Sequence, residues 1–167
     1  MATPTALPST FTANTVLPAA SLNLLRGAFR VLQVVQGLTT TGVSNSTTTA
    51  ADTTLTATIT PQYNTSKVLV LVSQTGCEKT STNSQNGINL YLLRGATQLQ
   101  QFAYAGLYTN TTVQGIGYFG TVFLDSPATT AATTYKTTFA NFTAAALVSV
   151  QVASITQSTI TLVEISA

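Results

Sequence analysis

The chain has 167 residues, about the length of one domain, and only 6% of them are charged although 44% are hydrophobic. This composition excludes an intrinsically disordered chain, and a net charge of +2 from six scattered basic residues gives no basic patch for nucleic acid. The surface must therefore consist mainly of uncharged Thr, Ser, Asn and Gln, which favours association with other subunits.

Residues 1–28 are expected to form an N-terminal attachment arm. Met1–Leu17 is rich in Ala, Thr and Pro and has no charged side chain, so it cannot bury much surface by itself. Pro18–Arg26 is predicted to be a short helix, because Pro18 suits the first helical position and Gly27 follows the end. The apolar anchors that would dock this arm on a partner are Leu17, Leu22, Leu24 and Leu25. The alternative is an arm that folds back on its own domain.

Strand patterns dominate residues 29–167, which we expect to form one all-β domain, an antiparallel β-sandwich of the jelly-roll type. Strands are predicted at Phe29–Val35, Thr54–Thr60, Lys67–Val72, Ile88–Leu93, Gln98–Tyr108, Tyr118–Leu124, Tyr135–Phe142, Leu147–Val152 and Thr159–Ile165. Lys67–Val72 is apolar on both faces, as a central strand would be. Leu38–Thr54 and Gly76–Gly87 are predicted loops. The eight or nine strands suit a jelly roll of two four-stranded sheets.

The residues that carry catalysis are mostly missing. The chain has no His, which removes Ser-His-Asp and Cys-His triads and nearly all catalytic zinc sites, and it has no glycine-rich phosphate loop. The four carboxylates, Asp52, Glu78, Asp125 and Glu164, could pair as in a glycosidase. The plainer interpretation places Asp125 at a turn, Asp52 and Glu78 in loops, and Glu164 facing outward from an edge or interface strand. We therefore predict no enzyme, no cofactor and no metal site.

Other features narrow the cell-biological context. The single cysteine, Cys77, rules out an internal disulfide and is expected to be a buried, unreactive thiol. The N-terminus lacks the basic and apolar regions of a signal peptide, and no window of 18 apolar residues predicts a membrane span. Aromatic side chains on the strands, such as Tyr104 and Tyr108, are expected in the core or in an interface, with a sugar-stacking platform as the alternative.

Several segments occur in a familiar order: Ile59–Pro61 with Ser66–Val70, Leu92–Gly95, Thr121–Lys136 (TVFLDSPATTAATTYK) and Ser158–Ile165 (STITLVEI). Together they resemble a β module of the virion proteins of tailed bacteriophages, including those of cyanobacteria. Asn14–Leu25 (NTVLPAASLNLL) resembles a short attachment segment that precedes phage structural domains. The resemblance covers most of residues 29–167. It implies a structural role, a jelly-roll-like fold and trimers, and it brings no catalytic residues.

We therefore expect a virion structural protein, namely a trimeric capsid decoration, or cement, protein whose arm clamps the outer shell. Its partners would be further copies of itself and the major capsid protein or another virion protein, with neither nucleic acid nor membrane. The alternative is a receptor-binding tip or short tail fibre that recognises a host-surface glycan. Amide-rich loops such as Thr80–Gln85 are compatible with that alternative, but we find no coiled coil or repeat that would build a fibre shaft.

Overall fold

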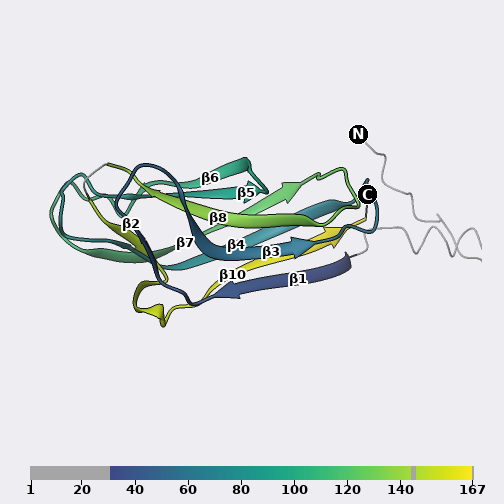
Figure 1. Ribbon diagram of the computed structural model, residues 1–167, viewed down its shortest axis with the longest axis horizontal. Coiled ribbons are helices and arrows are strands. Elements are labelled where there is room, and N and C mark those ends of the chain that lie inside the picture. The colour runs from purple at the N-terminus through teal and green to yellow at the C-terminus, as the bar shows by residue number, and fades with distance from the viewer. Residues whose placement is uncertain (1–30, 144–145, 167) are drawn as a thin grey trace, which may run out of the picture.

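The computed structural model describes residues 31–143 and 146–166 (Figure 1). The predicted attachment arm, with its helix and its anchors Leu17, Leu22, Leu24 and Leu25, lies outside the described residues. The strands are β1 Val31–Thr39, β2 Val43–Asn45, β3 Ala51–Ile59, β4 Lys67–Lys79, β5 Ile88–Arg94, β6 Thr97–Gly106, β7 Gly115–Asp125, β8 Thr133–Asn141, β9 Val148–Val150 and β10 Ser158–Ile165, with a short 3-10 helix at Val152–Ser154.

The strands form two antiparallel sheets that pack against each other, which confirms the predicted all-β, jelly-roll-like sandwich (Figure 1). The first sheet has the order β1-β10-β4-β9-β2, with β7 on the other side of β4, and the second has the order β3-β8-β5-β6. The first sheet is therefore six-stranded rather than four-stranded, because the short strands β2 and β9 extend it. The remaining eight strands divide four and four, as a jelly roll requires.

The strand bounds differ from the predicted ones at several places, two of which put a carboxylate on a strand. The predicted loop Leu38–Thr54 holds all of β2 and the start of β3, so Asp52 lies on a strand. Strand β4 continues beyond the predicted end at Val72 to Lys79, so Glu78 also lies on a strand. The hydrophobic pattern stops after Val72 because the next inward-facing side chain, Gln74, is polar. Period-2 hydrophobicity therefore could not reveal the continuation.

Buried polar side chains divide the core into two apolar clusters. Val72 on β4 and Tyr135 on β8 belong to one cluster, whereas Cys77 and Phe139 on the same strands belong to the other. Gln74 and Thr137 lie between the clusters along these strands, and both are fully buried.

Hydrogen bonds satisfy this buried polar layer. The Thr137 hydroxyl donates to Gln74 Oε1 at 2.9 Å and lies 2.6 Å from the Thr53 hydroxyl. Gln74 Nε2 donates to Ser158 Oγ at 3.2 Å. These four side chains come from β4, β8, β3 and β10, so the network connects the two sheets through the middle of the sandwich. Because each buried polar group needs a specific partner, the network fixes how the sheets align.

Candidate functional site

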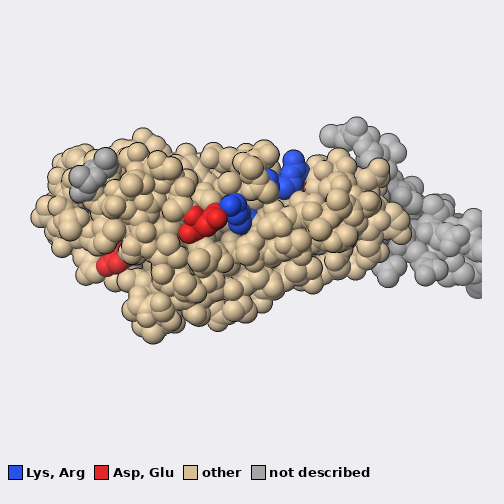
Figure 2. Space-filling model, in the orientation of Figure 1, with Lys and Arg blue, Asp and Glu red and all other residues tan. Residues whose placement is uncertain are grey.

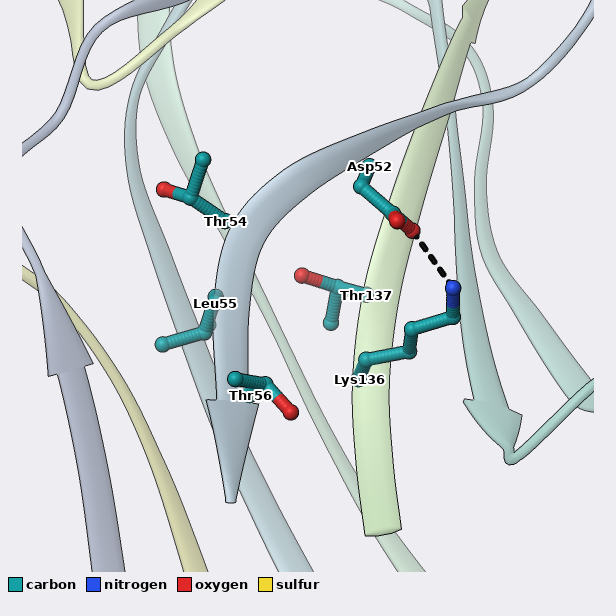
Figure 3. Close-up of a pocket in the computed structure, with 6 residues that line it drawn as sticks. All are labelled: Asp52, Thr54, Leu55, Thr56, Lys136 and Thr137. Carbon is teal, nitrogen blue, oxygen red and sulfur yellow. Dashed lines mark ion pairs between the residues drawn. The ribbon is translucent and has the colours of Figure 1, made fainter.

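A small pocket opens on the outer side of the second sheet (Figure 3). Its volume is about 180 Å³, and it is lined by Asp52, Thr54, Leu55, Thr56, Lys136 and Thr137. The pocket exists because β3 bulges away from β8 between Asp52 and Thr56, where Thr54 adopts the left-handed conformation with φ 69°. Pockets that enclose a small organic ligand usually measure roughly 300–1,000 Å³. This hollow is therefore too small to be a substrate pocket of that kind.

The two charged groups at the rim of this pocket bind each other. Lys136 Nζ lies 2.8 Å from Asp52 Oδ1, and more than half of the Asp52 side chain is exposed (Figure 3). An exposed pair of this kind usually contributes at most about 1 kcal/mol to stability. We assign it to the polar surface of the second sheet rather than to a reaction centre.

The other three carboxylates are held at separate places. Asp125 accepts two hydrogen bonds from Arg94 Nη1, at 3.0 and 2.8 Å, and one from the Tyr135 hydroxyl at 2.6 Å. Burial, followed by this bond to Asp125, raises the pKa of Tyr135. Glu78 accepts a hydrogen bond from Gln114. In the described part of the chain, no group of three or more His, Cys, Asp or Glu side chains is placed to hold a metal ion.

Glu164 contradicts its prediction most clearly. It was expected to face outward, but it is fully buried at the end of β10. Gln33 Nε2 donates to its Oε2 at 2.5 Å, and the backbone N–H of Gln62 donates to its Oε1 at 2.7 Å. Neither partner is adjacent to Glu164 in sequence, so only the fold reveals why this strand can point a carboxylate inward.

The outer face of the first sheet is the most unusual surface of the described chain. On β1, β4 and β7, large apolar side chains between 37% and 75% exposed point away from the sandwich. They are Val34, Leu38, Leu71, Ile116, Tyr118, Val122 and Leu124. We call this set the apolar face.

The strand register aligns the apolar face into rows across the sheet. Val34, Val163, Leu69 and Leu124 are successive partners across β1, β10, β4 and β7, and they form an entirely aliphatic row. In the next row along the strands, Gln36 on β1 and Thr161 on β10 are followed by Leu71 on β4 and Val122 on β7. The aliphatic row and the Leu71–Val122 pair are therefore continuous across β4 and β7. Sequence reasoning anticipated part of it, since both faces of Lys67–Val72 were predicted to be apolar.

The outer face of the second sheet differs in composition. It presents Thr56 and Thr58 from β3, Thr134 and Lys136 from β8, and the exposed Gln98 from β6. The Thr58 and Thr134 hydroxyls lie 2.7 Å apart across the strands. Charged side chains appear only as isolated spots on the side of the molecule seen in Figure 2. The sandwich thus has one polar outer face and one apolar outer face.

The β4–β5 loop, the β6–β7 loop and the segment after β8 lie at the end of the sandwich opposite the start of β1 (Figure 1). Aromatic and amide side chains of these segments and of β6 contact one another. The rings of Tyr104 and Tyr108 each contact Phe142 edge-on, with centroids 5.3 and 6.1 Å apart. The Tyr108 hydroxyl donates to Gln85 Oε1, and Gln85 Nε2 donates to Asn110 Oδ1 at 2.8 Å. We call these five residues the tip cluster.

A buried lysine holds the loop that carries part of the tip cluster. Lys79 is fully buried, and its Nζ donates to Thr109 Oγ1 at 2.5 Å and to the Thr111 carbonyl at 3.1 Å. Both acceptors lie in the loop between β6 and β7. The charged hydrogen bonds tie this loop to the end of β4, and Asn110 lies between the two threonines.

No protein-family model matches the chain, and no curated protein matches it. Among solved structures, the chain is similar to one described as "Structure of infectious bursal disease virus Gt strain", with a TM-score of 0.34 and 17% sequence identity. The match covers 80% of this chain and 37% of that chain, so this chain spans little more than a third of that chain's length. We therefore infer function from this chain's own residues and surfaces.

No helix in the described ranges is both long enough and apolar enough to cross a membrane.

Proposed function

We propose that this chain is a structural protein of a virion, namely a capsid decoration protein that works as a homotrimer. In this role, the sandwich sits on the outer shell, and the arm of residues 1–28 contacts the major capsid protein or another virion protein. The sequence resemblance to phage virion β modules supports this proposal, as do the low charge and the lack of His.

The observation that carries the proposal is the contrast between the two outer faces. The second sheet presents threonines, glutamine and an ion pair to solvent, as the surface of a soluble sandwich does. The first sheet presents instead one entirely aliphatic row, the adjacent Leu71–Val122 pair and the exposed Tyr118. A large exposed apolar patch usually marks an interaction surface. A subunit of an assembly needs such a surface, whereas a freely soluble monomer loses solubility by having one.

A second candidate function rests on the tip cluster. Exposed tyrosines beside amide side chains can stack on a sugar ring and hydrogen-bond to its hydroxyls. Tyr104 is 71% exposed, and the cluster lies far from the end where the chain enters β1 (Figure 1). A receptor-binding tip of a short tail fibre would use this end to recognise a host-surface glycan.

The copy number of the chain in purified virions separates the two functions. A decoration protein should be present in an amount comparable with the major capsid protein, as measured by quantitative mass spectrometry of the particles. A tail protein should be present in far fewer copies. The chain's absence from purified particles would overturn both proposals.

A further inference from the structure

We infer that the apolar faces of three copies of this chain pack together around the axis of the homotrimer, so that the apolar face of each copy contacts those of its neighbours. The inference rests on the proposed structural role, and it names the surface and the partner through which subunits associate. The central contact would be the row of Leu71 and Val122, flanked by Val34 and Leu124 on one side and Tyr118 on the other.

The size of the apolar face suits an interface between subunits. The seven residues of the apolar face together expose on the order of 700 Å², backbone atoms included, which is comparable with the roughly 300–600 Å² of the largest apolar patches on monomers. Each partner of a standard protein–protein interface contributes about 800 Å². The face is therefore large enough, with its margins, to hold neighbouring copies together.

The chemistry of the face selects a second apolar face as its partner. No charged side chain lies in the two central rows, from Val34 to Leu124 and from Gln36 to Val122. The polar side chains of the second row hydrogen-bond to each other, since Gln36 Nε2 donates to Thr161 Oγ1 at 3.1 Å. Lys67 lies at one end of the sheet, where its Nζ donates to Ser126 Oγ at 2.8 Å. The free energy of association is most favourable when both surfaces are apolar, because neither then loses hydrogen bonds to water.

The other broad surface of this chain does not meet that condition. Covering the outer face of the second sheet with aliphatic side chains would bury the Asp52–Lys136 pair and the hydroxyls of Thr56 and Thr58. Desolvating such groups without new partners is costly. Among the broad sheet faces that the structure describes, the complementary partner of the apolar face is therefore its own copy.

The first test replaces Val122 with Lys in the full-length chain and measures the mass in solution by sedimentation. Val122 is 64% exposed on β7, so the monomer can hold the new ammonium group in water. Burying that charge between neighbouring copies should weaken association at least tenfold, leaving monomers at concentrations where the wild type is oligomeric. The matched control is Gln98→Lys, which adds the same charge on β6 of the opposite sheet.

The inference is overturned if the wild type is monomeric, or if Val122→Lys has the same mass as the wild type and Gln98→Lys. Circular dichroism and a thermal melt of each variant show whether it is folded. The result bears on this inference alone: a chain that associates through this face but is missing from virions would refute only the proposed function.

A cross-linking measurement avoids any dependence on the charged variant. Burial raises the pKa of the Cys77 thiol to about 12, so the native cysteine stays protonated and unreactive near neutral pH. A Val122→Cys variant should form covalently linked copies with a flexible bismaleimide cross-linker, which reaches further than a disulfide, whereas Gln98→Cys should not. If neither variant links, or if both link equally, the faces do not meet. In that case, residues 1–30 or another protein would be the partner of the apolar face.

Discussion

At the scale of single residues, Glu164 shows how partners decide the state of a buried charge. Burial works to raise the pKa of this carboxyl group, but hydrogen bonds to its charged form, that of Gln33 first, lower the pKa by more. The net pKa lies below the usual value of 4.5. Glu164 is therefore ionised in the folded protein near neutral pH although it is fully buried.

Replacing Glu164 with Gln should lower the free energy of unfolding at pH 7 by roughly 1–3 kcal/mol. The reason is that one of the two donors, Gln33 Nε2 or the Gln62 N–H, would then face the amide NH₂ group of the new side chain. Since the folded pKa is below the unfolded one, the charged group contributes fully above pH 4.5. Its contribution is lost as the pH falls through the folded pKa. The stability gap between wild type and variant should thus be constant from about pH 5 to 8 and shrink in acid.

Urea unfolding at a series of pH values measures this gap. Asp52→Asn is the control, because it breaks only the exposed pair with Lys136 and should cost at most about 1 kcal/mol. A gap that widens with acid would show that the carboxyl group is protonated in the folded state.

At the scale of elements, Gly37 decides how closely β1 approaches β3. A Cβ atom at this position would lie 1.9 Å from the Thr56 carbonyl oxygen, a distance that no real structure permits. The backbone of β1 therefore comes nearer to the second sheet than any side chain would allow. This contact closes one side of the sandwich, since β1 and β3 belong to different sheets.

Gly37→Ala should push β1 away from β3 and cost at least about 1–3 kcal/mol, the usual penalty for overpacking. Gly115→Ala on β7 is the matched control, because its added Cβ would meet its nearest neighbours at an ordinary 3.5 Å. That variant should leave stability unchanged or raise it by up to about 1 kcal/mol. Thermal melts compare the two variants, and equal melting temperatures would contradict the close approach at Gly37.

At the scale of the whole molecule, the sandwich begins with β1 at Val31 and pairs it at once with β10, near the end of the chain. The described members of the apolar clusters and of the polar layer lie within residues 35–162. We therefore expect truncation of the arm to separate its proposed role from that of the sandwich.

Deleting Met1–Leu25 should leave a folded β-sandwich that still associates through the apolar face but no longer binds the particle. Burying one leucine side chain contributes about 1.5–3 kcal/mol, so several leucine anchors in each arm could hold an oligomer on its partner. Replacing Leu22 and Leu25 with Asp should have the same effect without shortening the chain.

Occupancy on particles that lack the protein, measured by sedimentation, tests this prediction. Equal binding of truncated and full-length chains would place the docking surface on the sandwich. Unfolding of the truncated chain would show instead that the arm belongs to its own domain.

The amino-acid sequence by itself determined the fold class and most of the strands. Period-2 alternation, frequent Thr and regular turn signals predict an antiparallel sandwich without tertiary information. The lack of His likewise limits the available chemistry at the level of composition. The two apolar faces of Lys67–Val72 already indicated an apolar surface outside the core, because a strand whose outer face is solvated needs only one apolar face.

Only the tertiary structure decided which side of each strand meets the other sheet and which polar groups are buried. Alternation shows which residues share a face, but not which face is covered, and so the apolar face could not be outlined from sequence. From their polarity alone, Gln74 and Glu164 would be placed on the outside of the sandwich. In the structure, Thr137 and Ser158 hydrogen-bond to Gln74. Gln33 and Gln62 hydrogen-bond to Glu164, and all four partners come from distant parts of the chain. A buried polar group is stable only with such partners, and long-range strand pairing supplies them.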